Sequence, residues 1–152
     1  VCMRDPRESI PSLLKMLKQT WRSMGWGPEK IDASIDKLIE QSLHSYLHPR
    51  EVLSRSPDTV WCEVDYRELT ADPQSAVEKI YGTLGLDMSP SLQTALKEAG
   101  AKRGTHTTGH TYDLAEFGLD DETIEKALPE LFADYGWNDV GALPAQPEPE
   151  DL

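Results

Sequence analysis

The stretch "VCMRDPRESIPS", residues 1–12, decides the fold class of this chain. Three apolar residues lead straight into a turn that holds two arginines and two prolines. The apolar start is typical of a buried strand. Asp5-Pro6-Arg7-Glu8 then supplies an N-cap, a proline suited to the first helical position and a capping-box acid. The stretch therefore predicts a strand that runs directly into a helix.

Apolar spacing continues that helix over residues 7–24, because Ile10, Leu14, Leu17 and Trp21 recur at the interval of one buried face. Pro11 has no N–H to donate to the helix, so we expect a kinked or restarted first turn. A second amphipathic helix is predicted from Ile31, ending near His48-Pro49, with residues 50–55 as a short further helix.

The stretch "SPDTVWCEVDYREL" (56–69) predicts the second strand, because a Ser-Pro-Asp turn precedes alternating apolar residues at Val60, Cys62 and Val64. Helices are then predicted over 73–84 and 90–99, and a loop over 100–114. The last helix covers 120–137, with Pro129 inside it or dividing it. Residues 138–152 form an acidic, proline-rich tail that we expect to be disordered.

Two strands cannot form a stable parallel sheet, which needs both faces covered. If the two are parallel neighbours linked through helices, their remaining partners lie in other sequence. We therefore interpret residues 1–137 as the C-terminal part of an α/β domain, helix-rich and with about two strands in this chain.

Length and charge narrow the classes of function that this chain can have. The 152 residues suit one domain, and the net charge of -12 argues against general nucleic-acid binding. No apolar run reaches the roughly 20 residues of a membrane span. Residues 1–22 nevertheless carry five basic and two acidic side chains, a balance of +3, so the front end could hold a small anion. Cys2 and Cys62 are expected to be buried thiols, which favours a reducing, cytoplasmic compartment.

Arg4 and Ser12 are the residues we expect to hold that anion. Ligands of open α/β sheets bind at the carboxyl ends of strands, where Arg4 stands, and a helix N-terminus there attracts phosphate. Ser12 follows eight residues later, about two helical turns, so one phosphate could contact both side chains. The alternative is a surface arginine and an ordinary helical serine.

Three stretches resemble the sulfotransferases that use 3′-phosphoadenosine 5′-phosphosulfate, and most closely the bacterial type. "RDPRESIPS" is similar to that family's 3′-phosphate-binding segment, with Arg4, Pro6 and Ser12 at the matching places. "VDYRELTADPQSAVEKIYGTLGL" resembles the later strand and helix, which places Tyr66 against the adenine. "AKRGTHTTGHTYDLAEFGL" resembles the late basic loop that closes on the 3′-phosphate, which adds Arg103 and Gly104, with Lys102 beside them.

The resemblance implies a P-loop-like three-layer fold with a parallel sheet. It also implies transfer of a sulfuryl group from 3′-phosphoadenosine 5′-phosphosulfate to an acceptor hydroxyl or amine, leaving adenosine 3′,5′-bisphosphate. The family's Lys-bearing phosphosulfate loop and usual catalytic base would stand before Val1, so this chain alone is predicted to be inactive. Expected partners are a small-molecule, glycan or lipid acceptor, with residues 20–55 as candidate walls, and the N-terminal part of the fold; a homodimer stays open.

Other interpretations stay open beside this one. His44 and His48 could share a helix face as metal ligands, but no third ligand suggests itself, so no metal site is predicted. Glu63 and Asp65 are more typical of a solvated face than of an acid–base pair. His106 or His110 could act as a general base, although a phosphate-side or structural role is favoured.

A second functional class also remains open, a non-catalytic helical interaction module that keeps the fold without the chemistry. A third and weaker interpretation is a relative of the nucleoside-phosphate kinases, which share the strand–helix plan but would also need a Lys-bearing loop.

Overall fold

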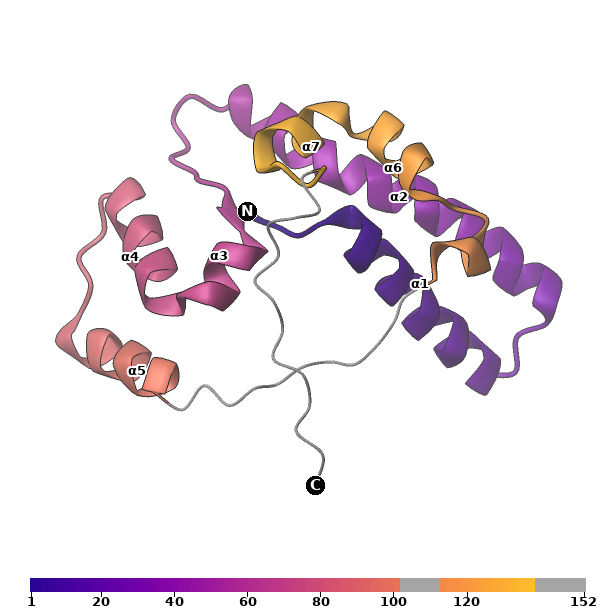
Figure 1. Cartoon of the computed structure of the whole chain (residues 1–152), viewed down its shortest axis with the longest axis horizontal. Helices are drawn as coiled ribbons and strands as arrows, with labels where there is room; N and C mark the ends of the chain where they lie inside the picture. Colours follow the sequence, from indigo (N-terminus) through magenta and orange to yellow (C-terminus); the bar gives the residue numbers. More distant parts are fainter. Residues whose placement is uncertain (102–112, 139–152) are drawn as a thin grey trace.

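The computed structural model describes residues 1–101 and 113–138 of the chain (Figure 1). Its two strands are β1 (Cys2–Met3) and β2 (Val64–Asp65). The helices are α1 (Pro6–Ser23), α2 (Pro28–Ser54), α3 (Tyr66–Ala71), α4 (Pro73–Thr83), α5 (Pro90–Ala101), α6 (Asp121–Ala127) and α7 (Pro129–Tyr135), with a short 3-10 helix, η1, at Leu114–Phe117.

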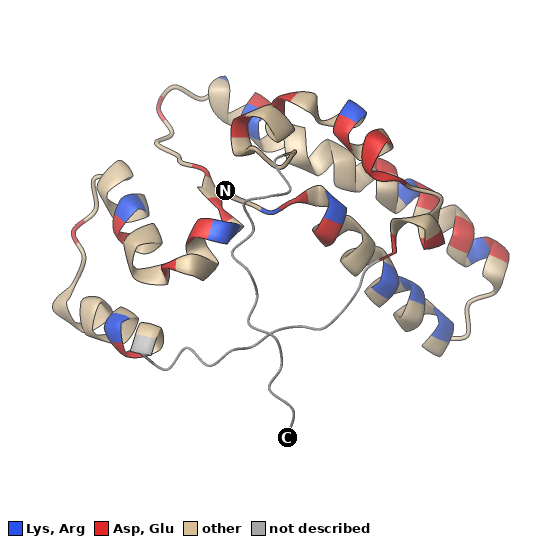
Figure 2. Cartoon of the chain, in the orientation of Figure 1, with Lys and Arg blue, Asp and Glu red and all other residues tan. Residues whose placement is uncertain are grey.

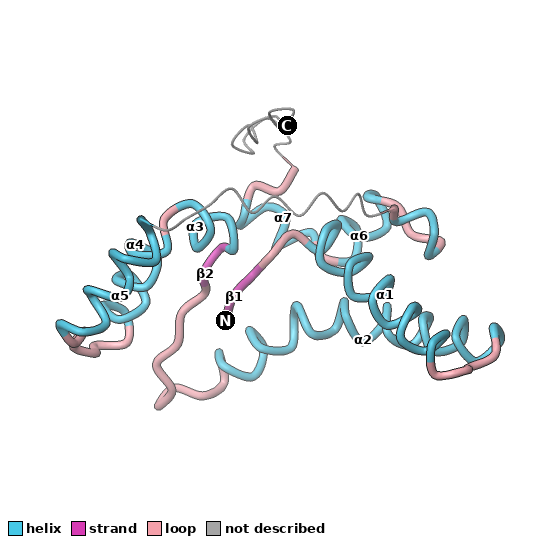
Figure 3. Tube along the Cα trace, turned by 90° about the horizontal axis from the view of Figure 1, so that it is seen from below, coloured by secondary structure: helices cyan, strands magenta, loops and turns pink. Residues whose placement is uncertain are grey.

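The strands are parallel neighbours, as the sequence predicted. Cys2 pairs with Val64 and Met3 with Asp65, so both strands end at the same edge of the sheet. Figure 3 shows the two strands side by side, with α3, α4 and α5 on one flank and α1, α2, α6 and α7 on the other. The fold is thus helix-rich α/β with a two-strand parallel sheet. The assigned part of β2 is shorter than the predicted strand, which began at Val60.

Helix α1 begins where the cap predicted. The Asp5 side chain accepts a hydrogen bond from the Arg7 amide, and Pro6 occupies the first turn. The expected kink or restart at Pro11 is not seen as a break, since the helix is assigned continuously through it. Pro11 is fully buried beside Ile10, so packing of this face compensates for the hydrogen bond that a proline cannot donate.

Helix α2 is longer than predicted. It runs through Pro49 to Ser54 as one helix. Tertiary contacts beyond the proline explain the difference. Arg50, which follows Pro49, forms ion pairs with Glu63 and with Asp134 and so ties the last turns of α2 to other elements.

Two buried apolar clusters stabilise the fold. Between α1 and α2 lie Ile10, Leu14, Ile31 and Ile35. Beneath α6 and α7, β1 contributes its one buried residue to a cluster of Met3, Ile124, Leu128, Leu131, Phe132 and Trp137. The second cluster places the end of α7 next to β1, which leads into α1.

Helix α3 and η1 were not predicted, and the remaining elements differ from prediction mainly at their ends. Pro129 divides the predicted 120–137 helix into α6 and α7. Residues 102–112 of the predicted loop and 139–152 of the predicted tail lie outside the described residues. Within the described ranges, none of the helices combines the length and apolar character needed to cross a membrane.

Candidate functional site

The shared carboxyl edge of the two strands brings together Arg4 and Tyr66, two of the residues singled out from the sequence. Met3 pairs with Asp65, and Arg4 and Tyr66 are the residues that follow each partner. The guanidinium carbon of Arg4 lies 4.9 Å from the centroid of the Tyr66 ring, within range of a cation–π contact. The Tyr66 ring remains exposed, so a ligand can reach it.

Arg4 is held from two directions. Its Nε and Nη2 donate to Glu8 Oε2 at 3.2 and 3.1 Å, in an ion pair whose side chains are both open to solvent. Its backbone carbonyl accepts a hydrogen bond of 2.7 Å from the Tyr46 hydroxyl on α2. Burial raises the pKa of Tyr46, so this phenol stays protonated and able to donate at neutral pH.

Ser12 stands on α1, half-buried, and forms no hydrogen bond with Arg4 among the described residues. The hydroxyl that does lie in the network is that of Ser9, which is close to both the Asp5 carbonyl, at 3.1 Å, and the Tyr46 hydroxyl. Because Tyr46 donates to the Arg4 carbonyl, the single Ser9 proton goes either to Asp5 or to Tyr46. The structure therefore joins Arg4 with Tyr66 and leaves the Arg4–Ser12 pairing as a prediction.

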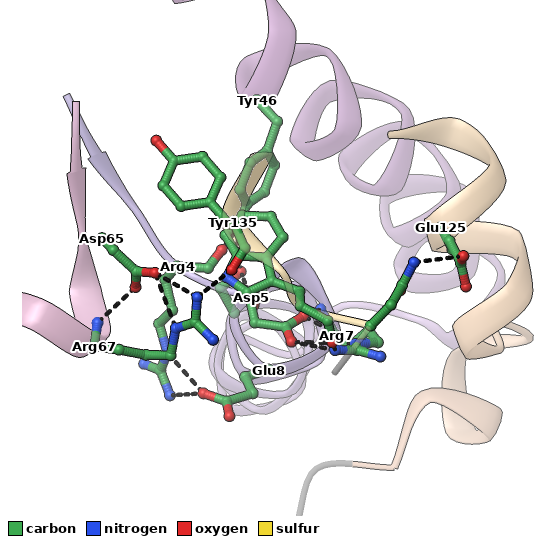
Figure 4. Close-up of polar contacts among 12 residues, drawn as sticks. Arg4, Asp5, Arg7, Glu8, Tyr46, Asp65, Arg67, Glu125 and Tyr135 are labelled. Carbon is green, nitrogen blue, oxygen red and sulfur yellow. Dashed lines mark hydrogen bonds and ion pairs between the residues drawn. The ribbon is translucent and has the colours of Figure 1, made fainter. Parts of the chain in front are cut away.

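Two further arginines lie at this edge, each bound to the aspartate that caps its helix (Figure 4). Arg7 Nη2 donates to Asp5 at 2.6 Å, and Arg67 Nη2 donates to Asp65 at 2.6 Å. These hydrogen bonds raise the pKa of both guanidinium groups. The basic balance of residues 1–22 is visible along α1 in Figure 2, but at the strand ends the arginines are paired with carboxylates.

A second ionic cluster joins α2, the segment before β2, and α7. Arg50 donates to Glu63 at 2.6 and 2.5 Å and to Asp134 at 2.6 Å, while the Tyr135 hydroxyl donates to Glu63 at 2.7 Å. Burial alone would raise the pKa of Glu63, yet the hydrogen bonds from Arg50 and Tyr135 outweigh it and the pKa is lowered. Glu63 is thus a bound counter-ion, and Asp65 is a helix cap, so the two do not form an acid–base pair.

Several predicted positions lie elsewhere. Arg103, Gly104, Lys102, His106 and His110 fall outside the described residues. The rings of His44 and His48 stack with centroids 4.8 Å apart on α2. Across the described ranges, no group of three or more His, Cys, Asp or Glu side chains is placed to hold a metal ion.

An open apolar pocket of about 410 Å³ borders both strands. Of the predicted acceptor walls, residues 20–55, only Leu53 contributes to it; the other lining residues include Cys2, Trp61, Val64 and Ile80. A second pocket, of about 340 Å³, does lie within the predicted range, between Trp21 and α2 residues such as Lys30 and Lys37. The pocket beside the strands therefore lies almost entirely outside residues 20–55 and the second lies within them, and the acceptor role of residues 20–55 stays a prediction.

A sequence model of the sulfotransferase family matches residues 1–90, more than half of the chain. The chain belongs to the sulfotransferase family. The matched residues of this sulfotransferase-family chain include β1, β2 and both members of the Arg4–Tyr66 pair. Searches of curated proteins and of solved structures found no significant match.

The aspartate–arginine pairs and Tyr46 were not predicted from the sequence. The pairs had a signal, because Asp-x-Arg-Glu occurs at residues 5–8, shortly after β1, and again at 65–68, beginning on the last residue of β2. The second copy is also a capping pattern for α3, a helix that was not predicted. Tyr46 gave no such signal, since only the packing of α2 against α1 brings its hydroxyl to Arg4.

Proposed function

We propose that this chain supplies the 3′-phosphate and adenine side of the donor site in a sulfotransferase that uses 3′-phosphoadenosine 5′-phosphosulfate. The observation that carries the proposal is the contact of Arg4 with Tyr66 at the shared strand edge. A nucleotide bears a phosphate and an aromatic base a few ångströms apart, and here a guanidinium stands beside an exposed aromatic ring at the edge where α/β folds bind ligands.

Arg4 suits the phosphate because two of its N–H groups already hold an oxyanion. Both Nε and Nη2 donate to the Glu8 carboxylate, and a phosphate would take those donors in its place. Ser12 would add a hydroxyl from the next turns of α1, and Arg103 with Gly104 would close on the same phosphate. Tyr66 would stack on the adenine, an interaction worth about 1–3 kcal/mol for a base on an aromatic side chain.

In sulfuryl transfer the acceptor hydroxyl or amine loses a proton to a base and forms the new bond to sulfur. The bond from sulfur to the 5′-phosphate oxygen breaks, and adenosine 3′,5′-bisphosphate leaves. We assign binding and orientation of the nucleotide to residues of this chain. The base and the loop that holds the 5′-phosphosulfate are proposed to come from sequence before Val1, because neither predicted strand of this chain is followed by a Gly-rich, Lys-bearing phosphate loop.

We also infer a reducing, cytoplasmic setting, which the two free thiols of Cys2 and Cys62 support, although Cys2 is exposed and Cys62 half-buried instead of both being buried as expected. The acceptor is proposed to be a small molecule, a glycan or a lipid.

Calorimetry on the full-length protein tests the donor assignment. Adenosine 3′,5′-bisphosphate should bind at one site and much more tightly than adenosine 5′-monophosphate, which lacks the 3′-phosphate. Equal affinity for the two nucleotides would contradict the assignment to the 3′-phosphate. No binding of either would favour a non-catalytic interaction module.

A further inference from the structure

The same short arrangement joins each strand to the helix that comes after it. Asp5-Pro6-Arg7-Glu8 begins α1, and Asp65-Tyr66-Arg67-Glu68 begins α3. In each copy the aspartate caps the helix by accepting from the arginine amide, at 2.9 Å for Arg7 and 2.7 Å for Arg67. In each copy the arginine side chain also folds back onto that aspartate. We call these two units the Asp5–Arg7 and Asp65–Arg67 clamps.

Both clamps reach the same third element. Arg7 Nη2 donates to the Trp137 carbonyl, and Arg67 Nη2 donates to the Tyr135 carbonyl, in two short hydrogen bonds. The Tyr135 carbonyl is in the last turn of α7, where backbone oxygens lack helical partners and carry partial negative charge, and Trp137 lies two residues beyond the end of the helix. The chain at the end of α7 therefore forms hydrogen bonds with an arginine beyond the carboxyl end of each strand.

The fastened segment is itself well packed. Gly136 adopts a left-handed conformation with φ of 60° and ends the helix, which turns the chain back toward the strands. Trp137 is only 3% exposed, and its ring stacks on Tyr135 with centroids 4.8 Å apart. The Arg7 guanidinium lies 4.9 Å from the Phe132 ring centroid. Because these aromatic residues are packed against their neighbours, the end of α7 has a defined position.

We propose that Arg7 and Arg67 are positioning residues for the nucleotide site, an inference that rests on the proposed function. Each clamp begins at the residue adjoining a proposed ligand residue, since Asp5 follows Arg4 and Asp65 precedes Tyr66. Fastening both clamps to one rigid helix end fixes the two strand ends relative to each other. The distance between the Arg4 guanidinium and the Tyr66 ring is set in this way, without Arg7 or Arg67 contacting the nucleotide.

The test measures affinity and docking separately in the full-length protein. Titration with adenosine 3′,5′-bisphosphate should show about tenfold weaker binding for Arg7→Ala and for Arg67→Ala, the cost of a loosened rather than deleted site. Arg7→Lys and Arg67→Lys keep the positive charge but lose the planar, two-pronged guanidinium, so their affinities should fall between those of the unsubstituted protein and the alanine variants. Arg55→Ala is the matched control, because it removes an exposed arginine paired with Glu51 and should change nothing. Hydrogen exchange of the amides of residues 131–137 should quicken in the alanine variants.

The lysine variants keep the test decisive if an alanine variant fails to fold. Quickened exchange together with weakened binding supports the proposal. Unchanged exchange would show that the clamps do not dock α7, and quickened exchange with unchanged affinity would show a purely structural role; either result overturns it. Failure of the unsubstituted protein to bind the nucleotide would instead overturn the proposed function, and the positioning role with it.

Discussion

The Arg4 guanidinium lies 4.9 Å from the Tyr66 ring although the two residues stand at the ends of different strands. Parallel pairing of Met3 with Asp65 accounts for this, because it carries the next residue of each strand to one edge. A cation for phosphate and a ring for a base are thereby placed side by side.

Removal of the Tyr66 ring should weaken adenosine 3′,5′-bisphosphate binding about tenfold, the scale of one lost base–aromatic stack. Tyr66→Ala carries this change, and Tyr66→Phe is its control because it keeps the ring and the cation–π contact with Arg4. Calorimetric titration of both variants gives the comparison. Equal loss in the phenylalanine variant would mean that the hydroxyl, and not the ring, contacts the ligand.

Glu8→Gln should tighten nucleotide binding about threefold, because an exposed ion pair contributes little and its removal frees Arg4 from a competing carboxylate. Glu51→Gln is the matched control, since it breaks the exposed ion pair with Arg55 at the same i,i+4 spacing. Dissociation constants measured at low and physiological salt provide the readout. Weaker binding in Glu8→Gln would show that Glu8 holds Arg4 in place instead of competing for it.

Tyr46→Phe should lower the free energy of unfolding by about 1 kcal/mol, because the Arg4 carbonyl loses its hydrogen-bond donor. It should also weaken nucleotide binding, since Arg4 loses its link to α2. Urea unfolding and calorimetry measure the two effects. Tyr81→Phe should change neither, because the hydroxyl of this α4 tyrosine forms no hydrogen bond with the described residues. A Tyr46→Phe protein that matches Tyr81→Phe would contradict the assigned role.

The Arg50–Glu63 pair should make the free energy of unfolding vary with pH in the acidic range. The pKa of Glu63 is lowered in the folded protein, so its carboxylate stabilises the fold above the unfolded value of about 4.3 and this contribution is lost as pH falls through the folded pKa. Glu63→Gln should cost about 1–3 kcal/mol at neutral pH, and the deficit should shrink below about pH 4.

Thermal unfolding across pH 3–7 measures that deficit, with Glu122→Gln as a control at an exposed ion pair. A deficit that stays constant over the whole pH range would show that Glu63 keeps its ordinary pKa.

Local sequence patterns predicted the elements whose ends are marked by local chemistry. Asp5-Pro6 began α1, Asp72-Pro73 began α4, and Pro129 separated α6 from α7. From these patterns and the strand positions, the neighbourhood of Arg4 and Tyr66 could be anticipated, since it needs only parallel pairing.

Tertiary contacts decided the rest, and no local pattern reports them. Pro49 was expected to end α2. The helix continues to Ser54, and its last turns are held by the ion pairs of Arg50 with Glu63 and Asp134. The carbonyl contacts of Arg7 and Arg67 depend on where the end of α7 packs, far away in the sequence. The Asp-x-Arg-Glu repeat is visible in the sequence, but the carbonyl groups of Tyr135 and Trp137 that its arginines bind could not be predicted from it.

The most direct test of the central claim is calorimetric titration of the full-length protein with adenosine 3′,5′-bisphosphate, comparing the unsubstituted protein with Arg4→Ala and Ser12→Ala. We predict one site, a loss of about 100-fold for Arg4→Ala because a paired charge-assisted contact disappears, and a loss of about tenfold for Ser12→Ala. Binding that is absent in the unsubstituted protein, or unchanged in Arg4→Ala, would contradict the account.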